Sequence, residues 1–222
     1  MSARRDVALP PLFVAAFGTP DGAVSPGLRV AAVMFVAVLT AVAAQVSIPL
    51  PFTPVPFTLQ PVIVLIGGAV LGPRLGMISQ FLYLAAGAAG LPVFAASASL
   101  PQGPARLVGP TAGYLLSYPM AAWLTGRLAR RGFDRRYLTS VTAMLAGLAV
   151  IFACGVLWLS AFMPPAAGRF NTALHLGLYP FLLADVAKVC LAGLVLPTVW
   201  RFLGLNGRAG SSMLEDDEVL KR

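Results

Sequence analysis

Long apolar runs, separated by short polar or proline-rich connections, make up most of this 222-residue chain. A helix that crosses a bilayer needs about 20 mostly apolar residues, and fewer where protein surrounds its end. The pattern predicts an all-α integral membrane protein with six transmembrane helices, and a count of five or seven is the alternative. The predicted helices span residues 28–46, 59–72, 75–89, 109–128, 138–162 and 176–203.

The second and third runs are short, and only Gly72-Pro73-Arg74 separates them. Apolar segments of this length can stay in a membrane where neighbouring helices shelter their ends. The sequence therefore predicts a tight helical hairpin at this point.

The two ends of the chain are predicted to lie outside the membrane domain of residues 28–203. Residues 1–27 contain four prolines, so they lack the unbroken apolar run of a secretory signal. We interpret them as a cytoplasmic segment. Residues 204–222 include the acidic run EDDE and are predicted to form a polar, solvated tail.

The composition agrees with a membrane protein, because 58% of the residues are hydrophobic, 11% are charged and the mean hydropathy is +0.83. Soluble domains carry about 25% charged residues. The 16 Lys and Arg outnumber the 8 Asp and Glu, which in a soluble protein would raise the question of nucleic acid. The placement of the positive charges explains the excess better, so no nucleic-acid partner is expected.

Positive charge is distributed unevenly among the connections. Lys and Arg collect in the cytoplasmic loops of membrane proteins. With both termini in the cytoplasm, only Arg106 and Arg169 fall outside and Lys188 lies within a run, and the strongest cytoplasmic signal is RLARRGFDRR at 127–136. The other thirteen are Arg4, Arg5, Arg29, Arg74, Arg127, Arg130, Arg131, Arg135, Arg136, Arg201, Arg208, Lys221 and Arg222. The sequence therefore predicts cytoplasmic N and C termini.

The three outer connections differ from one another. Residues 47–61 hold five prolines and no charge, which favours extended backbone. Such backbone survives at membrane depth where it lines a cavity, so this segment is a candidate pocket wall, with an ordinary surface loop as the alternative. Residues 90–114 are long enough for a functional loop and are predicted to form a lid. Residues 163–175 have the composition of a simple connector.

Two opposite charges, Asp185 and Lys188, interrupt the last apolar run. Their spacing of three places both on one face of a helix, and each costs roughly 2.5–3.5 kcal/mol near a bilayer centre. One interpretation is a structural salt bridge. The other is a binding site in which a carboxylate and an ammonium hold a neutral ligand with adjacent N–H and C=O groups. No further ionisable group lies deeper before Arg201, which argues against ion translocation.

The residues offer little support for catalysis or metal binding. The chain's two lysines do not lie in a Walker motif, and neither a Gly-x-Ser-x-Gly elbow nor paired histidines appear. The single His175 and the absence of a Cys pair at metal spacing make a metal site unexpected. Cys154 and Cys190 are predicted to be packed thiols. We therefore expect neither an enzyme nor a bound cofactor.

Four motifs in order resemble one known family: PFTPVPFTLQ (51–60), YLAAGAAGLPVFA (83–95), GPTAGYLLSYP (109–119) and PFLLADVAKVCLA (180–192). The chain from about residue 30 to 203 resembles BioY, the biotin-specific substrate-binding subunit of energy-coupling factor transporters. The resemblance implies six membrane helices in the cytoplasmic (inner) membrane and high-affinity capture of biotin from outside. It also implies a coupling transmembrane subunit and two ATPase subunits as partners.

The resemblance further implies which residues hold biotin. Asp185 and Lys188 correspond to the pair that binds the ureido ring, and Arg106 is assigned to the valerate carboxylate, with a solvent-facing loop arginine as the alternative. Gln60 and Tyr83 are further polar candidates, and the candidate apolar walls are Phe52, Phe57, Tyr83 and Phe94. The sequence departs from the family pattern at Ala112, where a second glycine is usual, and after Phe94, where it is rich in Ala and Ser.

Ala37 and Ala41 have the small-xxx-small spacing that lets membrane helices approach closely. Similar alanine pairs in this family are held to contact the coupling subunit, and the resemblance extends that role to this pair. Packing within the chain is the alternative. At the level of function, a stand-alone biotin transporter and a subunit for another vitamin are the alternatives.

Overall fold

The computed structural model describes residues 9–19, 22–96, 102–165 and 168–204. Most of these residues are helical, and two short strands join the first two long helices. The elements are α1 Leu12–Phe17, α2 Pro26–Gln45, β1 Ser47–Ile48, β2 Phe57–Thr58, α3 Gln60–Ala88, the 3-10 helix η1 Pro104–Leu107, α4 Ala112–Leu116, α5 Tyr118–Ala129, the 3-10 helix η2 Phe133–Arg135, α6 Tyr137–Ser160, α7 Arg169–Gly177, α8 Tyr179–Ala192 and α9 Val195–Phe202.

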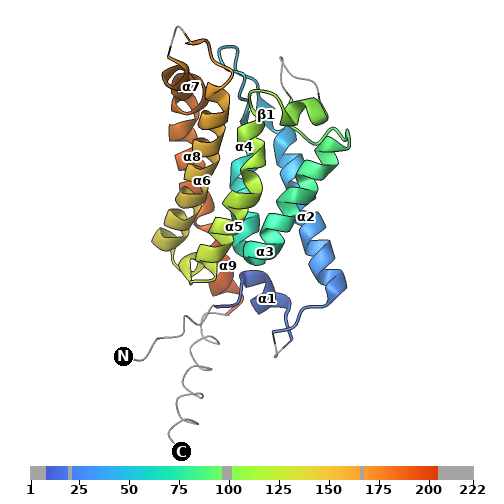
Figure 1. Ribbon diagram of the computed structural model, residues 1–222. Coiled ribbons are helices and arrows are strands. Elements are labelled where there is room, and N and C mark those ends of the chain that lie inside the picture. Colours follow the sequence, from blue (N-terminus) through green and yellow to red (C-terminus); the bar gives the residue numbers. More distant parts are fainter. Residues whose placement is uncertain (1–8, 20–21, 97–101, 166–167, 205–222) are drawn as a thin grey trace, which may run out of the picture.

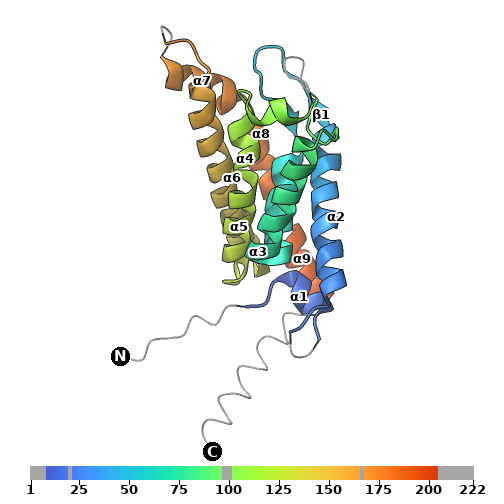
Figure 2. The ribbon, with the colours of Figure 1, turned by 45° about the vertical axis from the view of Figure 1, so that its right-hand side comes forward.

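The long helices run side by side along one axis and give the described residues an elongated shape (Figures 1 and 2). α1 and α9 lie at one end, which we call the terminal end. α7, β1 and β2 lie at the other, which we call the pocket end because the cavity described below is found there.

Four segments of the described chain are long and apolar enough to cross a membrane: α2, α3, α6, and the α8–α9 segment Tyr179–Phe202. The helical content and these segments agree with the predicted all-α membrane protein. The 109–128 run forms two helices, α4 and α5, which adjoin at Ser117.

α3 extends from Gln60 to Ala88, but its path reverses at Gly72. The backbone there has φ +80° and ψ 177°, a conformation in which glycine avoids the clash of a side chain. A Cβ on Gly76 would lie 2.7 Å from the Cα of Gly68, whereas eight residues of straight helix span about 12 Å. The arms 60–71 and 73–88 therefore lie against each other, which confirms the predicted hairpin.

The connections are more ordered than their composition suggests. Segment 47–61 is extended as predicted and forms a short antiparallel hairpin in which Ser47 pairs with Thr58. Segment 163–175, predicted to be a simple connector, contains most of α7. The predicted lid contains η1, and its residues 97–101 lie outside the described part of the chain.

The main core lies between the helices, with Leu65, Met144 and Leu159 fully buried. A second cluster at the terminal end includes Leu12 of α1. Residues 9–19, which were interpreted as part of a cytoplasmic segment, thus pack on the helix bundle. Residues 1–8 and the tail from 205 onward lie outside the described residues.

Candidate functional site

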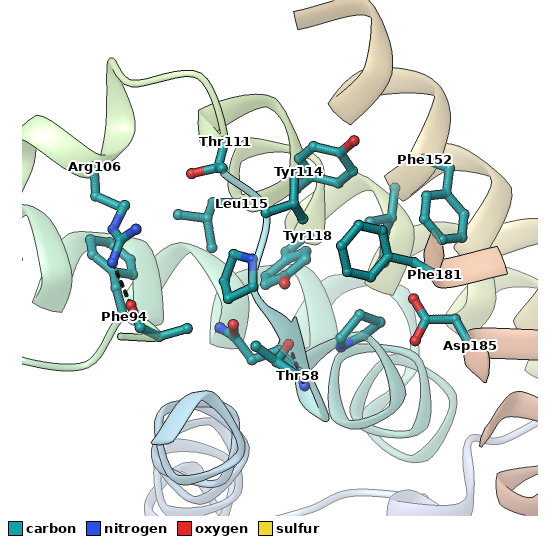
Figure 3. A pocket seen from close by; sticks show the side chains of 16 residues that line it. Thr58, Phe94, Arg106, Thr111, Tyr114, Leu115, Tyr118, Phe152, Phe181 and Asp185 are labelled. Carbon is teal, nitrogen blue, oxygen red and sulfur yellow. Dashed lines mark hydrogen bonds between the residues drawn. The ribbon is translucent and has the colours of Figure 1, made fainter. Parts of the chain in front are cut away.

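A cavity of about 620 Å³, including its mouth, lies at the pocket end. Its lining comes from the β1–β2 connection, the start of α3, the segment around η1, and helices α4, α5, α6 and α8 (Figure 3). The prediction that segment 47–61 forms a pocket wall is confirmed, because Val55, Pro56 and Thr58 line the cavity.

The predicted charged pair is formed. Lys188 Nζ donates a hydrogen bond to Asp185 Oδ1 over 2.6 Å. Asp185 is 7% exposed and lines the cavity. Its Oδ2 makes no hydrogen bond with another described residue, so it is available as an acceptor facing the cavity.

Lys188 does not line the cavity. Its ammonium also donates to the Thr58 carbonyl over 2.7 Å and lies 3.5 Å from the ring centroid of Phe57, an attractive cation–π arrangement. Lys188 therefore joins α8 to β2 and orients Asp185 from behind.

Arg106 lines the cavity at some distance from Asp185, and Figure 3 places Leu115 and Tyr118 between them. Arg106 is 2% exposed, so it is not a solvent-facing loop residue. Its Nη2 donates to the Ala95 carbonyl, and its buried Nε has no partner among the described residues. Burial lowers the pKa of this guanidinium. A buried cation that forms no ion pair within the described ranges favours an anionic ligand group.

Gln60 and Tyr83 form one polar unit. Gln60 Nε2 donates to Tyr83 Oη over 2.5 Å, and Tyr83 Oη donates to the Val93 carbonyl over 3.3 Å. Gln60 lines the cavity, whereas Tyr83 lies behind it. Tyr83 meets the Phe94 ring edge to face, with the centroids 5.5 Å apart, and so supports a wall residue.

The predicted aromatic walls are partly correct. Phe94 lines the cavity. Phe57 lies behind the lining and stacks on Phe181, with ring centroids 6.4 Å apart. Phe52 is 58% exposed and does not line the cavity. Its assignment as a wall was wrong because Phe52 lies in the turn between β1 and β2 and its side chain is on the exposed side of that connection.

Several lining residues were missed by sequence reasoning. Tyr114 and Tyr118 are four positions apart, a spacing that places them on one helix face, and both are buried. Tyr114 Oη donates to the Gly177 carbonyl over 2.9 Å. The GPTAGYLLSYP motif contained this signal. Phe181 precedes Asp185 by four positions and so shares its helix face, a signal that was overlooked. Phe152 lies within the long apolar run of α6 and has no comparable signal.

Ala37 is buried in the main core, and the partly buried Ala41 packs against that core. Both alanines therefore pack within the chain. A contact of this pair with a coupling subunit stays a prediction.

The groups that line the cavity indicate what kind of molecule can bind in it. A carboxylate acceptor, the Gln60 amide and a guanidinium with no anionic partner among the described residues border one cavity, and its other walls are mainly aromatic and aliphatic. The site therefore suits a compact, largely apolar molecule with N–H donors in one part and an acid group in another.

Comparison with known proteins gives a consistent picture. The sequence model of the BioY family matches residues 22–205. The chain is 42% identical to a probable biotin transporter BioY of Pyrococcus horikoshii over 73% of this chain and 89% of that protein. It is 36% identical to a biotin transporter BioY of Thermotoga maritima, with 71% and 86% covered. The fold is similar to a crystal structure of the S-component for biotin from an ECF-type ABC transporter, with a TM-score of 0.67, 24% identity, and 81% and 95% of the two chains covered.

Proposed function

The chain belongs to the BioY family, and from this membership and the cavity we propose that it captures biotin as the substrate-binding subunit of an energy-coupling factor transporter. The observation that carries the proposal is the cavity itself. It brings a buried carboxylate and a buried guanidinium to one apolar space without pairing them with each other. A cyclic urea with an acid side chain, which has N–H donors at one end and a carboxylate at the other, complements both groups.

In this proposal the ureido ring lies against Asp185. The carboxylate accepts an N–H of the ring, and the Gln60 amide supplies a second polar contact. Phe94, Phe181 and Leu115 contact the thioether ring and the chain. The valerate carboxylate pairs with Arg106, which supplies a charge-assisted hydrogen bond. Lys188 acts indirectly by holding Asp185 and the β2 segment in place.

The pocket end faces outward in the proposed orientation, and the chain crosses the cytoplasmic membrane six times. The two arms of α3, the α4–α5 unit, α2, α6 and the α8–α9 segment are the six crossings. Positive charge supports this orientation. Arg29 is in the first turn of α2, Arg74 follows the reversal of α3 and Arg127 is in the last turn of α5, and these parts of the helices lie toward the terminal end. Arg106 lines the cavity and Arg169 begins α7, both at the pocket end.

Energy for uptake is assigned to partners. The chain carries no Walker motif, so a coupling transmembrane subunit and two ATPase subunits supply ATP hydrolysis in this proposal. A stand-alone biotin transporter and a binding subunit for another vitamin are the competing proposals.

Calorimetric titration of the purified full-length protein with biotin, desthiobiotin and thiamine tests the assignment. We expect tight binding of biotin and no binding of thiamine. Desthiobiotin should also bind, because it keeps the ureido ring and the acid group. Binding of thiamine in preference to biotin would overturn the ligand assignment. Biotin uptake into liposomes that contain this protein alone would favour the stand-alone alternative.

A further inference from the structure

The terminal end contains a second buried aspartate, Asp134 of η2, which is 2% exposed. Its Oδ2 accepts a hydrogen bond from Trp200 Nε1 of α9 over 2.7 Å, and its Oδ1 has no partner among the described residues. The Arg135 guanidinium lies 4.3 Å from the centroid of the Trp200 ring. Because a buried carboxylate is costly without such contacts, these residues form a specific junction between α9 and the α5–α6 connection.

α1 covers this junction. Leu12 packs in one cluster with Trp200 and Leu196, and Leu9 N donates to the Arg130 carbonyl over 2.8 Å. The family model begins at residue 22, so α1 lies outside the matched region. We call Asp134, Arg135, Trp200 and Leu12 the latch.

The helix that the latch holds also carries the pocket's carboxylate. α8 and α9 meet at Gly193 and Leu194, both of which keep right-handed helical φ and ψ, and Gly193 N still donates to the Val189 carbonyl. Only 33% of the most apolar window of this segment is buried, against 56% for α3 and for α6. Packing alone therefore restrains it less than those helices, and polar contacts have more influence on its position.

Gly193 is a point of close approach between this helix and α6. A Cβ at Gly193 would lie 2.5 Å from Val141 Cγ2. Asp185 precedes Gly193 by 8 residues and Trp200 follows it by 7, which are about 12 Å and 10 Å of helix. A tilt about this contact that moves Trp200 also moves Asp185, in the opposite direction.

We propose that the latch positions α8 and thereby sets how tightly the pocket binds its ligand. This inference rests on the proposed function, because it concerns the affinity of that same site. Asp134 and Trp200 are positioning residues that never touch the ligand. Without the latch, a smaller fraction of molecules holds Asp185 at the cavity, and the apparent Kd rises in proportion.

The test uses the full-length protein in lipid nanodiscs. Trp200→Phe removes the indole donor but keeps an aromatic face for Arg135, and Asp134→Asn perturbs the same contact from the other side. Trp123→Phe is the matched control, because Trp123 also stacks with an arginine, Arg127, but makes no hydrogen bond through its indole among the described residues. Biotin Kd is measured together with amide hydrogen exchange of peptides covering 193–204 in the absence of biotin.

Trp200→Phe is expected to raise the biotin Kd about three- to tenfold and to speed amide exchange in residues 193–204. The double variant Trp200→Phe with Asp134→Asn should lose less binding free energy than the sum of the losses of the two single variants. Trp123→Phe should change neither quantity. A lower Tm with unchanged Kd would overturn the proposal, since it would show a purely structural contact. If the unaltered protein fails to bind biotin, the proposed function fails, whereas faster exchange in Trp200→Phe would still identify the junction as a restraint on α9.

Discussion

Two buried aspartates lie near opposite ends of this protein, and both are held by contacts with the α8–α9 segment. Asp185 pairs with Lys188 of its own helix and faces a cavity. Asp134 accepts a hydrogen bond from Trp200 of another element and is covered by an apolar cluster that includes α1. Each has one carboxylate oxygen without a hydrogen-bond partner in the described part of the chain, but only Asp185 lines the cavity.

The difference shows that burial of a charge does not by itself identify a binding site. A buried carboxylate needs compensation wherever it lies, and the protein supplies that compensation in two ways. At the pocket end the lysine partner approaches from behind and leaves the cavity side open. At the terminal end the partner is a bulky indole that joins two elements.

Replacing Asp185 should have the largest effect and is the strongest test of this comparison. Asp185→Asn places an amide where the ureido N–H needs a charged acceptor, and it leaves the Lys188 ammonium without its anion. A buried charged contact of this kind is worth about 2–5 kcal/mol, so biotin Kd should rise by about thirtyfold to several thousandfold, as measured by calorimetry. Circular dichroism and Tm serve as the folding control, and a Kd within threefold of the unaltered protein would remove Asp185 from the site.

The second prediction separates the two charged groups of the pocket. Arg106→Gln removes a charge-assisted hydrogen bond to the valerate carboxylate, worth about 1.5–3 kcal/mol, so biotin Kd should rise roughly ten- to a hundredfold. Biotin amide lacks the carboxylate, so its Kd should change little in the same variant. Equal losses for both ligands would mean that Arg106 acts only by holding Ala95 and the adjoining wall.

Sequence reasoning was most successful where one physical cost dominates. The cost of two ions in an apolar run identified the Asp185–Lys188 pair, and the Gly72-Pro73 break identified the hairpin. It was less successful where a side chain's direction depends on tertiary contacts. The sequence could not show that Lys188 turns toward the Thr58 carbonyl and Phe57 while Asp185 faces the cavity, or that Phe52 lies outside it.

The terminal-end contacts show the same limit more clearly. Asp134 lies among five arginines in RLARRGFDRR, a pattern typical of a solvated loop. Its burial depends on Trp200, which is 66 residues away in the chain. Long-range pairing of this kind has no local pattern. The packing of α1 on the helix bundle was missed for the same reason.

A third prediction concerns the support behind the pocket wall. Tyr83→Phe keeps the ring against Phe94 but removes the hydroxyl that accepts from Gln60 and donates to Val93. Loss of such neutral hydrogen bonds costs about 0.5–1.5 kcal/mol, so biotin Kd should rise about two- to tenfold. The matched control is Tyr179→Phe, since Tyr179 is 51% exposed and does not line the cavity. Equal effects of the two variants would contradict a role for the Gln60–Tyr83 unit.

The smallest expected effect is a pH dependence at the terminal end. Burial raises the pKa of Asp134, and the Trp200 hydrogen bond and the Arg135 charge offset this only in part. The folded protein therefore favours the protonated Asp134 carboxyl. This preference stabilises the folded state at pH values below the ordinary Asp pKa of about 3.9, and the stabilisation is lost as pH rises through the raised pKa of Asp134 in the folded protein. The Tm of the unaltered protein minus that of Asp134→Asn should fall by about one to three degrees between about pH 4 and pH 7. If this Tm difference instead increased between pH 4 and pH 7, the neighbouring arginines would keep Asp134 ionised, and Asp134 would contribute to the latch as a carboxylate that interacts with those arginines.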